Sequence, residues 1–536
     1  MVGPYQKAGE RRSNYVTKQH RCGTLVGGSA SAQAGYLYVA TYVPQRRPND
    51  DVGHLSRFDL GLGFVVLGVM RRTFFLLVGI TLVAACQASP RASRAALGRP
   101  ALPMVDPAER EIPTDVALAT FDSAWAKVRN TYYDPALKGL DWNAVRRELR
   151  PRAERAATRA QLRIVIMVML GRLGDSHMTV LPREFTASEP DDTKEDARPG
   201  GVGIEARIIG RSLVVWRVEP NGAAARAGVR PGWTVDYVDG TRPDSAIAVL
   251  SAQRNPRVRR TLSIQVTARL QNRFEGPAKS SFEAVFRDDK GATQRLTMVR
   301  TPLTGHPVKV GHMPVLVVQA SSHRIEHLPV RNSCVGVMRF NYWLLPVMTE
   351  LTSAMSNFES CAGIVIDLRG NVGGLAAMLS GVSGFLADTA APLAIVHSRG
   401  QEIRYDVFPR RTTQSGERVR PFGGAIAILI DPLTVSTSEV FAAGMRQLTQ
   451  GRARLFGQRS AGQALPAIVY KLPTGDVLMH AIGDLRLADG TRIEGEGVRP
   501  DVEVPLRQAD LLAGRDATLD AALRWIGEWN RRSRGE

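Results

Sequence analysis

Aromatic residues are scarce in this chain, and their scarcity bears on the meaning of its high positive charge. Phe, Trp and Tyr make up 6% of the 536 residues, whereas 70 Lys and Arg outnumber 51 Asp and Glu and give a formal net charge of +19. Nucleic-acid binding would need a basic stripe with interleaved aromatics, but the arginines are scattered along the chain. We therefore expect no nucleic-acid partner and interpret the charge as general basicity.

Long hydrophobic runs are also few. The apolar stretch at 74–85 is shorter than the roughly 20 residues that span a bilayer. Hydrophobic residues make up 44% and charged residues 23%, close to soluble globular averages, which excludes disorder, collagen and a multi-span membrane protein. At roughly 150 residues per domain, the length predicts three or four folded units.

The stretch at 74–85 has the form of a signal peptide. Met70, Arg71 and Arg72 give it a positive start, and small residues precede Cys86. This ending resembles a bacterial lipobox. The resemblance implies a lipoprotein signal peptide over 70–86 and a lipid on Cys86; a cleaved secretory signal without lipid is the alternative.

On the lipobox interpretation, Met70 is the true start and residues 1–69 are a mis-assigned upstream extension. Residues 87–107 are rich in Ala, Arg, Ser and Pro and form a linker. We expect an exported protein, lipid-anchored in the bacterial cell envelope and facing the periplasm.

Cysteine is rare, with four in the whole chain. Cys22 and Cys86 precede the folded region, which leaves Cys334 and Cys361. Each lies two residues before a glycine that opens an apolar strand, so the two sulfurs meet if the strands are neighbours. An oxidising compartment permits a disulfide. Two buried free thiols are the alternative, because spacing cannot show the required geometry.

Hydrophobic periodicity divides the folded region into three parts. Residues 108–198 contain helical patterns followed by an acidic linker at 182–199, and residues 199–305 are dominated by short β-like runs. In residues 306–530, strands at 335–340, 363–368 and 425–430 alternate with helices at 344–358, 375–386 and 438–448. This alternation predicts a mostly parallel α/β layer, followed by hairpins at 465–504.

Glycines open the middle part. Consecutive backbone amides at Gly201, Val202, Gly203 and Ile204 could form a concavity for an anion such as a peptide carboxylate. The run at 218–235, with its Ala-rich segment and Ala-Gly-Val-x-Pro-Gly turn, and Val-Asp-Gly at 238–240 resemble a PDZ domain. That resemblance implies binding of a peptide as an added strand; a module that only packs against its neighbours is the alternative.

Four separated segments carry the candidate chemistry. Asp175, Ser176 and His177 follow an apolar helix, and a glycine turn follows the strand that ends near Asp367. A third segment runs from Asp431 through Ser436 into a helix; Ser436 is either an exposed functional serine or an ordinary helix N-cap. The fourth, at 493–501, contains Glu494 and is otherwise a polar hairpin turn.

In this order, the segments resemble the carboxy-terminal processing (tail-specific) peptidases and the catalytic core of tricorn protease. The likeness covers about residues 108–506. It implies a Clp-protease/crotonase-like α/β core with an N-terminal helical domain and an inserted PDZ-like β domain. The first serine of the family's Ser-x-Ser-Glu motif matches Ser436. The lysine of the processing peptidases is replaced by Gln463, whereas the tricorn-like branch matches Ser176, His177 and Glu494.

The resemblance implies a serine-type peptidase without metal or cofactor. Ser436 would be the nucleophile and His177 the general base, since imidazole titrates near neutrality. Ser176 and Glu494 would orient the imidazole, with Asp175 a less favoured substitute. The amides of Thr437 and Gly373 would bind the oxyanion, with Gly374 as the fallback donor.

The sequence has features of three other classes of protein. His323, Glu326 and His327 fit His-x-x-Glu-His, but the segment is short, Pro329 follows, and no third zinc ligand is evident. A catalytically inactive peptide-binding lipoprotein is favoured by Gln463. A retinoid-binding-like role would leave His177 and Ser436 unexplained. We therefore expect an exported endopeptidase that acts on polypeptides and recognises their C-terminal tails.

Overall fold

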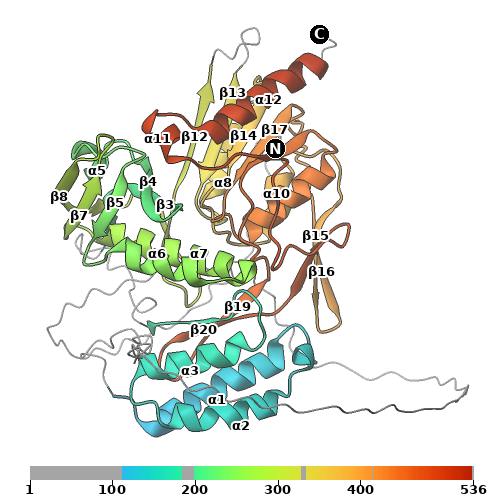
Figure 1. Cartoon of the computed structure of the whole chain (residues 1–536). Coiled ribbons are helices and arrows are strands. Elements are labelled where there is room, and N and C mark those ends of the chain that lie inside the picture. The colour runs from blue at the N-terminus through green and yellow to red at the C-terminus, as the bar shows by residue number, and fades with distance from the viewer. Residues whose placement is uncertain (1–110, 184–197, 327–333, 414–415, 534–536) are drawn as a thin grey trace, which may run out of the picture.

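The computed structural model describes residues 111–183, 198–326, 334–413 and 416–533. The expected signal peptide, Cys86 and the linker at 87–107 lie outside these residues, as do His327 and most of the acidic linker. Figure 1 shows a helical region at one end, a β-rich middle module (residues 199–305) and a large α/β core. Among the described residues, no helix is both long and apolar enough to cross a membrane.

The helical region joins the core through a hairpin from far along the chain. Its helices are α1 (Thr114–Thr131), α2 (Trp142–Glu154) and α3 (Arg159–Gly171), with the short η1 (Leu137–Gly139) between the first two. The hairpin is β19 (Ala467–Lys471) and β20 (Val477–Ala481), and β20 pairs with β1 (Thr179–Leu181). Leu465, Leu472 and Leu478 enter the same apolar cluster as the helices. The segment that carries His177 is therefore fixed to the C-terminal half of the chain.

The middle module contains a five-stranded antiparallel sheet. Its strand order is β3 (Ile204–Ile209), β4 (Ser212–Val218), β5 (Thr234–Val238), β7 (Ser281–Arg287) and β8 (Thr293–Val299). The short α5 (Ala223–Arg226) follows β4. A smaller sheet places β2 (Pro199–Gly201) between β6 (Glu275–Pro277) and β9 (Thr301–Pro302).

Two helices of this module were not expected from the sequence. They are α6 (Pro243–Ala252) and α7 (Pro256–Gln271), and η3 (Asn272–Phe274) follows. The Asn255 side chain caps α7 by accepting hydrogen bonds from the amides of Arg257 and Val258 at 3.0 and 3.3 Å. Proline at the first helical position is a start signal, and this Asn-Pro pair marks the helix better than its weak apolar periodicity.

The core sheet has six strands, in the order β12 (Ala320–Ile325), β13 (Val335–Phe340), β14 (Gly363–Asp367), β17 (Ala425–Ile430), β18 (Ala453–Gly457) and β22 (Val502–Glu503). Only the first pair is antiparallel. The expected α/β layer is thus observed, and strands 335–340 and 425–430 have the expected bounds.

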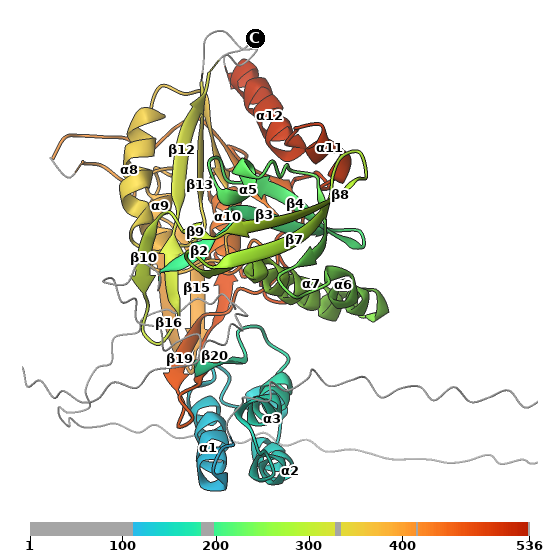
Figure 2. The ribbon, with the colours of Figure 1, turned by 90° about the vertical axis from the view of Figure 1, so that its left-hand side faces the viewer.

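Helices cover both faces of this sheet (Figures 1 and 2). On one face lie α8 (Val347–Asn357), α9 (Met378–Ser383) and α10 (Thr437–Leu448), and on the other lies α12 (Ala517–Ser533). Every residue of β17 is buried, because its side chains alternate between the two apolar clusters. The remaining elements are β10 (His306–Lys309), β11 (Val315–Val318), β15 (Pro392–Ser398), β16 (Gln401–Asp406), β21 (Asp484–Leu487) and α11 (Gln508–Leu512).

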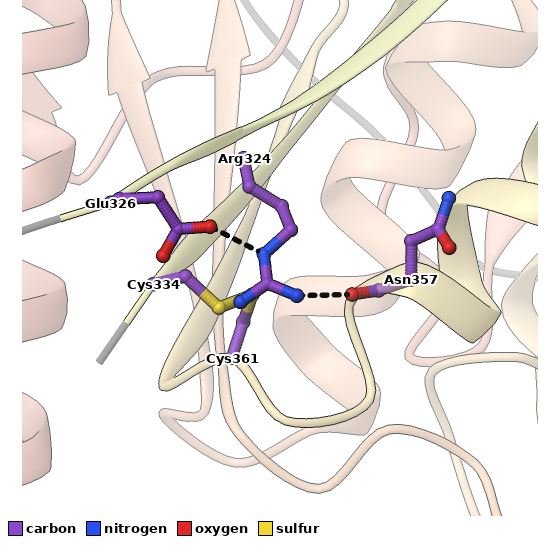
Figure 3. The surroundings of a disulfide bond; sticks show 5 residues. All are labelled: Arg324, Glu326, Cys334, Asn357 and Cys361. Atoms are coloured by element: carbon purple, nitrogen blue, oxygen red, sulfur yellow. Dashed lines mark hydrogen bonds and ion pairs between the residues drawn. A yellow bond between two sulfur atoms is a disulfide. The ribbon is translucent and has the colours of Figure 1, made fainter. Parts of the chain in front are cut away.

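Cys334 and Cys361 form a disulfide, which decides between the two alternatives left open by the sequence. Their Cα atoms are 4.7 Å apart, immediately before the parallel neighbours β13 and β14. The Arg324 side chain lies beside the disulfide and bonds to Glu326 and to the carbonyl of Asn357 (Figure 3). The bridge closes the β13–α8–β14 unit at its base.

Candidate active site

Ser436 lies on a sharp turn between β17 and α10. Its backbone has φ 59° and ψ −120°, whereas an ordinary N-cap has extended backbone angles. A positive φ is unusual for a residue with a side chain and is a form of strain that concentrates at functional sites. Ser436 therefore occupies the N-cap position in a conformation that the N-cap role does not require.

The Glu439 carboxylate holds this turn. It accepts hydrogen bonds from four groups: the amides of Ser436, Gly462 and Gln463 at 3.0, 2.7 and 2.9 Å, and Ser460 Oγ at 2.6 Å. Glu439 is fully buried, and burial raises the pKa of its carboxyl while these donors oppose the rise. The sequence signal for this residue is the Ser-x-x-Glu spacing of a capping box.

His177 is held in one tautomer by Ser176 and Glu494. Ser176 Oγ donates its proton to Glu494 Oε2 at 2.9 Å, so it can only accept from the imidazole. The distance between Ser176 Oγ and His177 Nδ1 is 2.8 Å. The hydrogen-bond pattern therefore assigns the ring proton to Nδ1 and leaves Nε2 with its lone pair. Hydrogen bonds thus join the three side chains in the order Glu494, Ser176, His177.

Burial shifts the titration of both ends of this relay. His177 is 6% exposed, and burial lowers the pKa of its imidazole to about 4, which favours the neutral ring. Burial also raises the pKa of the Glu494 carboxyl to about 7, although the Ser176 and Ala464 amides and Ser176 Oγ oppose this. His177 is thus neutral near pH 7, and Glu494 is close to its midpoint.

Asp175 is not part of the relay. Its carboxylate accepts from the Tyr132 hydroxyl and, at 2.9 Å, from the Tyr133 hydroxyl, and it pairs with the Lys138 ammonium. These partners belong to the helical region and the loop after α1. Asp175 therefore anchors the segment that carries His177 and is ruled out as the substitute orienting group.

The two halves of the site meet at Gln463 and Ala464. The Gln463 amide donates to Glu439, which also holds the amide of Ser436, and the Ala464 amide donates to Glu494 Oε2 at 2.9 Å. Adjacent residues of one loop thus contact the carboxylate behind Ser436 and the carboxylate behind His177. The segments that the sequence separates by about 260 residues are bridged by this loop.

The candidate oxyanion donors require one correction. The Gly373 amide donates to Asn371 Oδ1 at 3.0 Å, because an Asn side chain readily captures the amide two residues ahead. Thr437 Oγ1 donates to the Gly374 carbonyl at 3.0 Å, which places the two residues side by side. Among the described residues, neither the Gly374 nor the Thr437 amide donates a hydrogen bond, so these two amides are the candidates.

Asn371 is a further site residue that sequence reasoning missed. It is fully buried, accepts from Ser438 Oγ at 2.8 Å and donates through Nδ2 to the Phe340 carbonyl at 2.8 Å. It thereby ties the glycine turn to α10 and to the end of β13. Position 374 also needs glycine, since a Cβ there would lie 2.2 Å from the Trp343 carbonyl oxygen.

The expected anion site at Gly201, Val202, Gly203 and Ile204 is not a row of free amides. Gly201 lies in β2 between two strands, and the Val202 amide donates to the Phe274 carbonyl at 3.3 Å. Gly203 and Ile204 lead into β3. At Gly200 a Cβ would lie 2.6 Å from the Ala278 Cα, so close backbone packing explains a glycine here.

The structure describes no cluster of three or more His, Cys, Asp or Glu side chains suited to a metal within residues 111–183, 198–326, 334–413 and 416–533. His323 lies on β12, a strand, whereas His-x-x-Glu-His requires a helix.

Residues 334–504 match peptidase family S41, and residues 118–171 match the tricorn protease C1 domain. The chain is 24% identical over 392 residues to carboxyl-terminal-processing peptidase 2, chloroplastic, of Arabidopsis thaliana, covering 72% of this chain and 68% of that one. It is also 24% identical to putative tricorn protease homolog 2 of Streptomyces coelicolor, covering 75% of this chain but 32% of that protein.

Solved structures show the same fold. The crystal structure of mature CPAF superposes with a TM-score of 0.51 at 13% identity and covers 78% of this chain and 98% of that one. The S41 match includes Ser436 and Glu494, whereas the tricorn C1 match ends at Gly171, shortly before His177. Residues 334–504 thus form a peptidase family S41 domain, and the chain is a serine-type peptidase similar to the carboxyl-terminal processing peptidases and to tricorn protease.

Proposed function

We propose that this chain is an exported serine endopeptidase with Ser436 as nucleophile and His177 as general base. The hydrogen-bonded order Glu494, Ser176, His177 carries the proposal, because it leaves His177 Nε2 as the proton acceptor. The strained turn at Ser436 and the loop that joins both halves support the same assignment.

The reaction would proceed by acyl transfer. Ser436 Oγ attacks the scissile carbonyl carbon while its proton passes to His177 Nε2, and the amides of Thr437 and Gly374 bind the oxyanion. His177 then gives the proton to the leaving amine. A water molecule, deprotonated by the same imidazole, releases the product and restores Ser436.

Gln463 stands where processing peptidases of this kind carry a lysine, and it favours the alternative of an inactive peptide-binding protein. A carboxamide cannot act as a base at neutral pH. In this chain, however, the Gln463 main-chain amide supports Glu439, and the imidazole supplies a base from another segment. We therefore favour the active peptidase.

The natural substrates in this proposal are polypeptide tails held by the middle module. The sequence resemblance of residues 199–305 to a PDZ domain supports this role, and so does the five-stranded sheet flanked by α7. The lipobox-like ending at Cys86 supports attachment to the bacterial envelope, facing the periplasm.

Digestion of an unfolded polypeptide tests the proposal. The full chain should cleave reduced, denatured β-casein, and both Ser436→Ala and His177→Ala should abolish cleavage, measured by gel and mass spectrometry. Asp175→Asn is the matched control and should cleave at a temperature where it is folded. Cleavage that persists in Ser436→Ala would contradict the assignment.

A further inference from the structure

The outer edge of the middle module's sheet is covered by a side chain instead of a strand. β3 is the first strand of the five-stranded sheet and, among the strands that the structure describes, pairs on one side only, with β4. An edge strand presents backbone donors and acceptors that can pair with another chain. At this edge, Gln271, the last residue of α7, lies against β3.

The Gln271 carboxamide makes two hydrogen bonds to the β3 backbone. Its Nε2 donates to the Ile204 carbonyl at 2.8 Å, and its Oε1 accepts from the Ala206 amide at 2.8 Å. A carboxamide has the same donor and acceptor as a peptide group. Gln271 therefore supplies to Ile204 and Ala206 the two bonds that an added polypeptide strand would supply.

This edge lies beside the candidate active site. Ile264, two turns before Gln271 on α7, packs with Val435 and Ala461 next to the catalytic turn. On the same helix, Arg260 Nη2 donates to the Gly495 carbonyl at 2.6 Å, one residue beyond Glu494. Helix α7 would thus contact both a strand seated between β3 and α7 and the residues that pack next to the catalytic turn.

We propose that Gln271 is a built-in competitor for the tail-binding edge of β3. An extended polypeptide pairs with Ile204 and Ala206 only after displacing the Gln271 carboxamide. Since Ile204 and Ala206 are buried in the free protein, the edge stays closed to strands until this displacement occurs. The inference rests on the proposed binding of tails by this module and adds the residue that opposes it.

Peptide affinity tests the competition directly. In the full chain carrying Ser436→Ala, fluorescence anisotropy of a fluorescein-labelled decapeptide ending in Leu-Val-Ala measures binding without cleavage. Gln271→Ala removes both competing bonds, so the Kd should fall roughly tenfold. Gln265→Ala is the matched control, because Gln265 is an exposed glutamine of the same helix, and it should leave the Kd unchanged.

Hydrogen exchange shows whether the peptide takes the predicted place. Fragments spanning 204–209 should exchange slowly in the parent, faster in Gln271→Ala, and slowly again when the peptide is added. An unchanged or higher Kd in Gln271→Ala, or peptide protection elsewhere but not at 204–209, would overturn the proposal. Because Ser436 is absent from these proteins, failure of the proposed catalytic mechanism would leave the measurement unaffected and would appear in the β-casein digestion instead.

Discussion

At the scale of single residues, burial acts in opposite directions on the two titratable groups behind Ser436. It lowers the pKa of His177 to about 4 and raises that of Glu494 to about 7. The imidazole is therefore a neutral base over the whole range in which the carboxyl changes its charge. The acid limb of the activity should belong to Glu494 and not to the histidine.

The pH profile of kcat/KM tests this assignment. Ionised Glu494 accepts the Ser176 proton, so activity should rise with pH through about 7, with no separate step from His177 until about pH 4. In Glu494→Gln, activity should be lower and flat between pH 5 and 8. An unchanged acid limb in Glu494→Gln would assign the titration to another group.

The same shift has a consequence for stability. The folded pKa of Glu494 lies above the ordinary value of 4.5, so its contribution to stability is full below about pH 4.5 and is lost as the pH rises through about 7. Ionised Glu494, the form that would favour catalysis, is therefore the form that lowers the stability of the folded protein.

Ser176 should matter more for turnover than for folding. Ser176→Ala removes the acceptor for His177 Nδ1–H, so the tautomer is no longer fixed and kcat should fall roughly a hundredfold with little change in KM. Asp175→Asn weakens contacts with Tyr132, Tyr133 and Lys138 and should lower the thermal midpoint while kcat is kept. Equal loss of kcat in the two variants would contradict the relay.

Sequence motifs indicated the candidate side chains of the site better than its candidate backbone donors. Ser436, His177, Ser176 and Glu494 could be found because each lies in a short motif of recognisable residue types. The second candidate oxyanion donor could not be found in this way, because the choice between the Gly373 and Gly374 amides depends on which of them donates to the Asn371 side chain. This hydrogen bond depends on the geometry of the turn, and two adjacent glycines in the sequence do not indicate that geometry.

At the scale of elements, the parallel strands of the core were predictable and the helices of the middle module were not. Strands 335–340 and 425–430 are continuous apolar runs because both faces are covered, and their bounds follow from that run. Helix α7 carries arginines around much of its surface, so the 3.6-residue apolar pattern is weak. Only its Asn-Pro start gave a local signal.

The disulfide should stabilise the β13–α8–β14 unit. It closes a loop with a sequence separation of 27, for which chain entropy predicts about 3.5 kcal/mol. The double variant Cys334→Ser, Cys361→Ser should therefore unfold at lower denaturant, followed by circular dichroism. Reductant should lower the parent's midpoint and leave the double variant unchanged; a parent insensitive to full reduction would contradict this role.

At the scale of the whole molecule, buried charges join the middle module to the active-site turns. Arg207 on β3 donates to Asp431 Oδ2 at 2.9 Å, and Asp431 Oδ1 accepts from the amides of Gly370 and Leu433. Arg207 also stacks on Trp216, with 4.1 Å between the guanidinium carbon and the ring centroid. One arginine of the module thus supports the turns after both β14 and β17.

Removing this arginine should destabilise the assembled protein. Arg207→Met leaves Asp431 buried without its cation, which typically costs about 3–5 kcal/mol of unfolding free energy. Scanning calorimetry should show a lower midpoint than for Arg211→Met, the control at an exposed arginine in the turn after β3. Equal midpoints for the two variants would show that the buried pair does not hold the module.

The most direct test of the catalytic assignment is covalent labelling of the full chain with a fluorophosphonate at pH 8. Tandem mass spectrometry should place one adduct on Ser436, and labelling should be lost in His177→Ala while Asp175→Asn still reacts. An adduct on a residue other than Ser436, or equal labelling of the parent and of His177→Ala, would contradict the assignment of Ser436 as nucleophile and His177 as base.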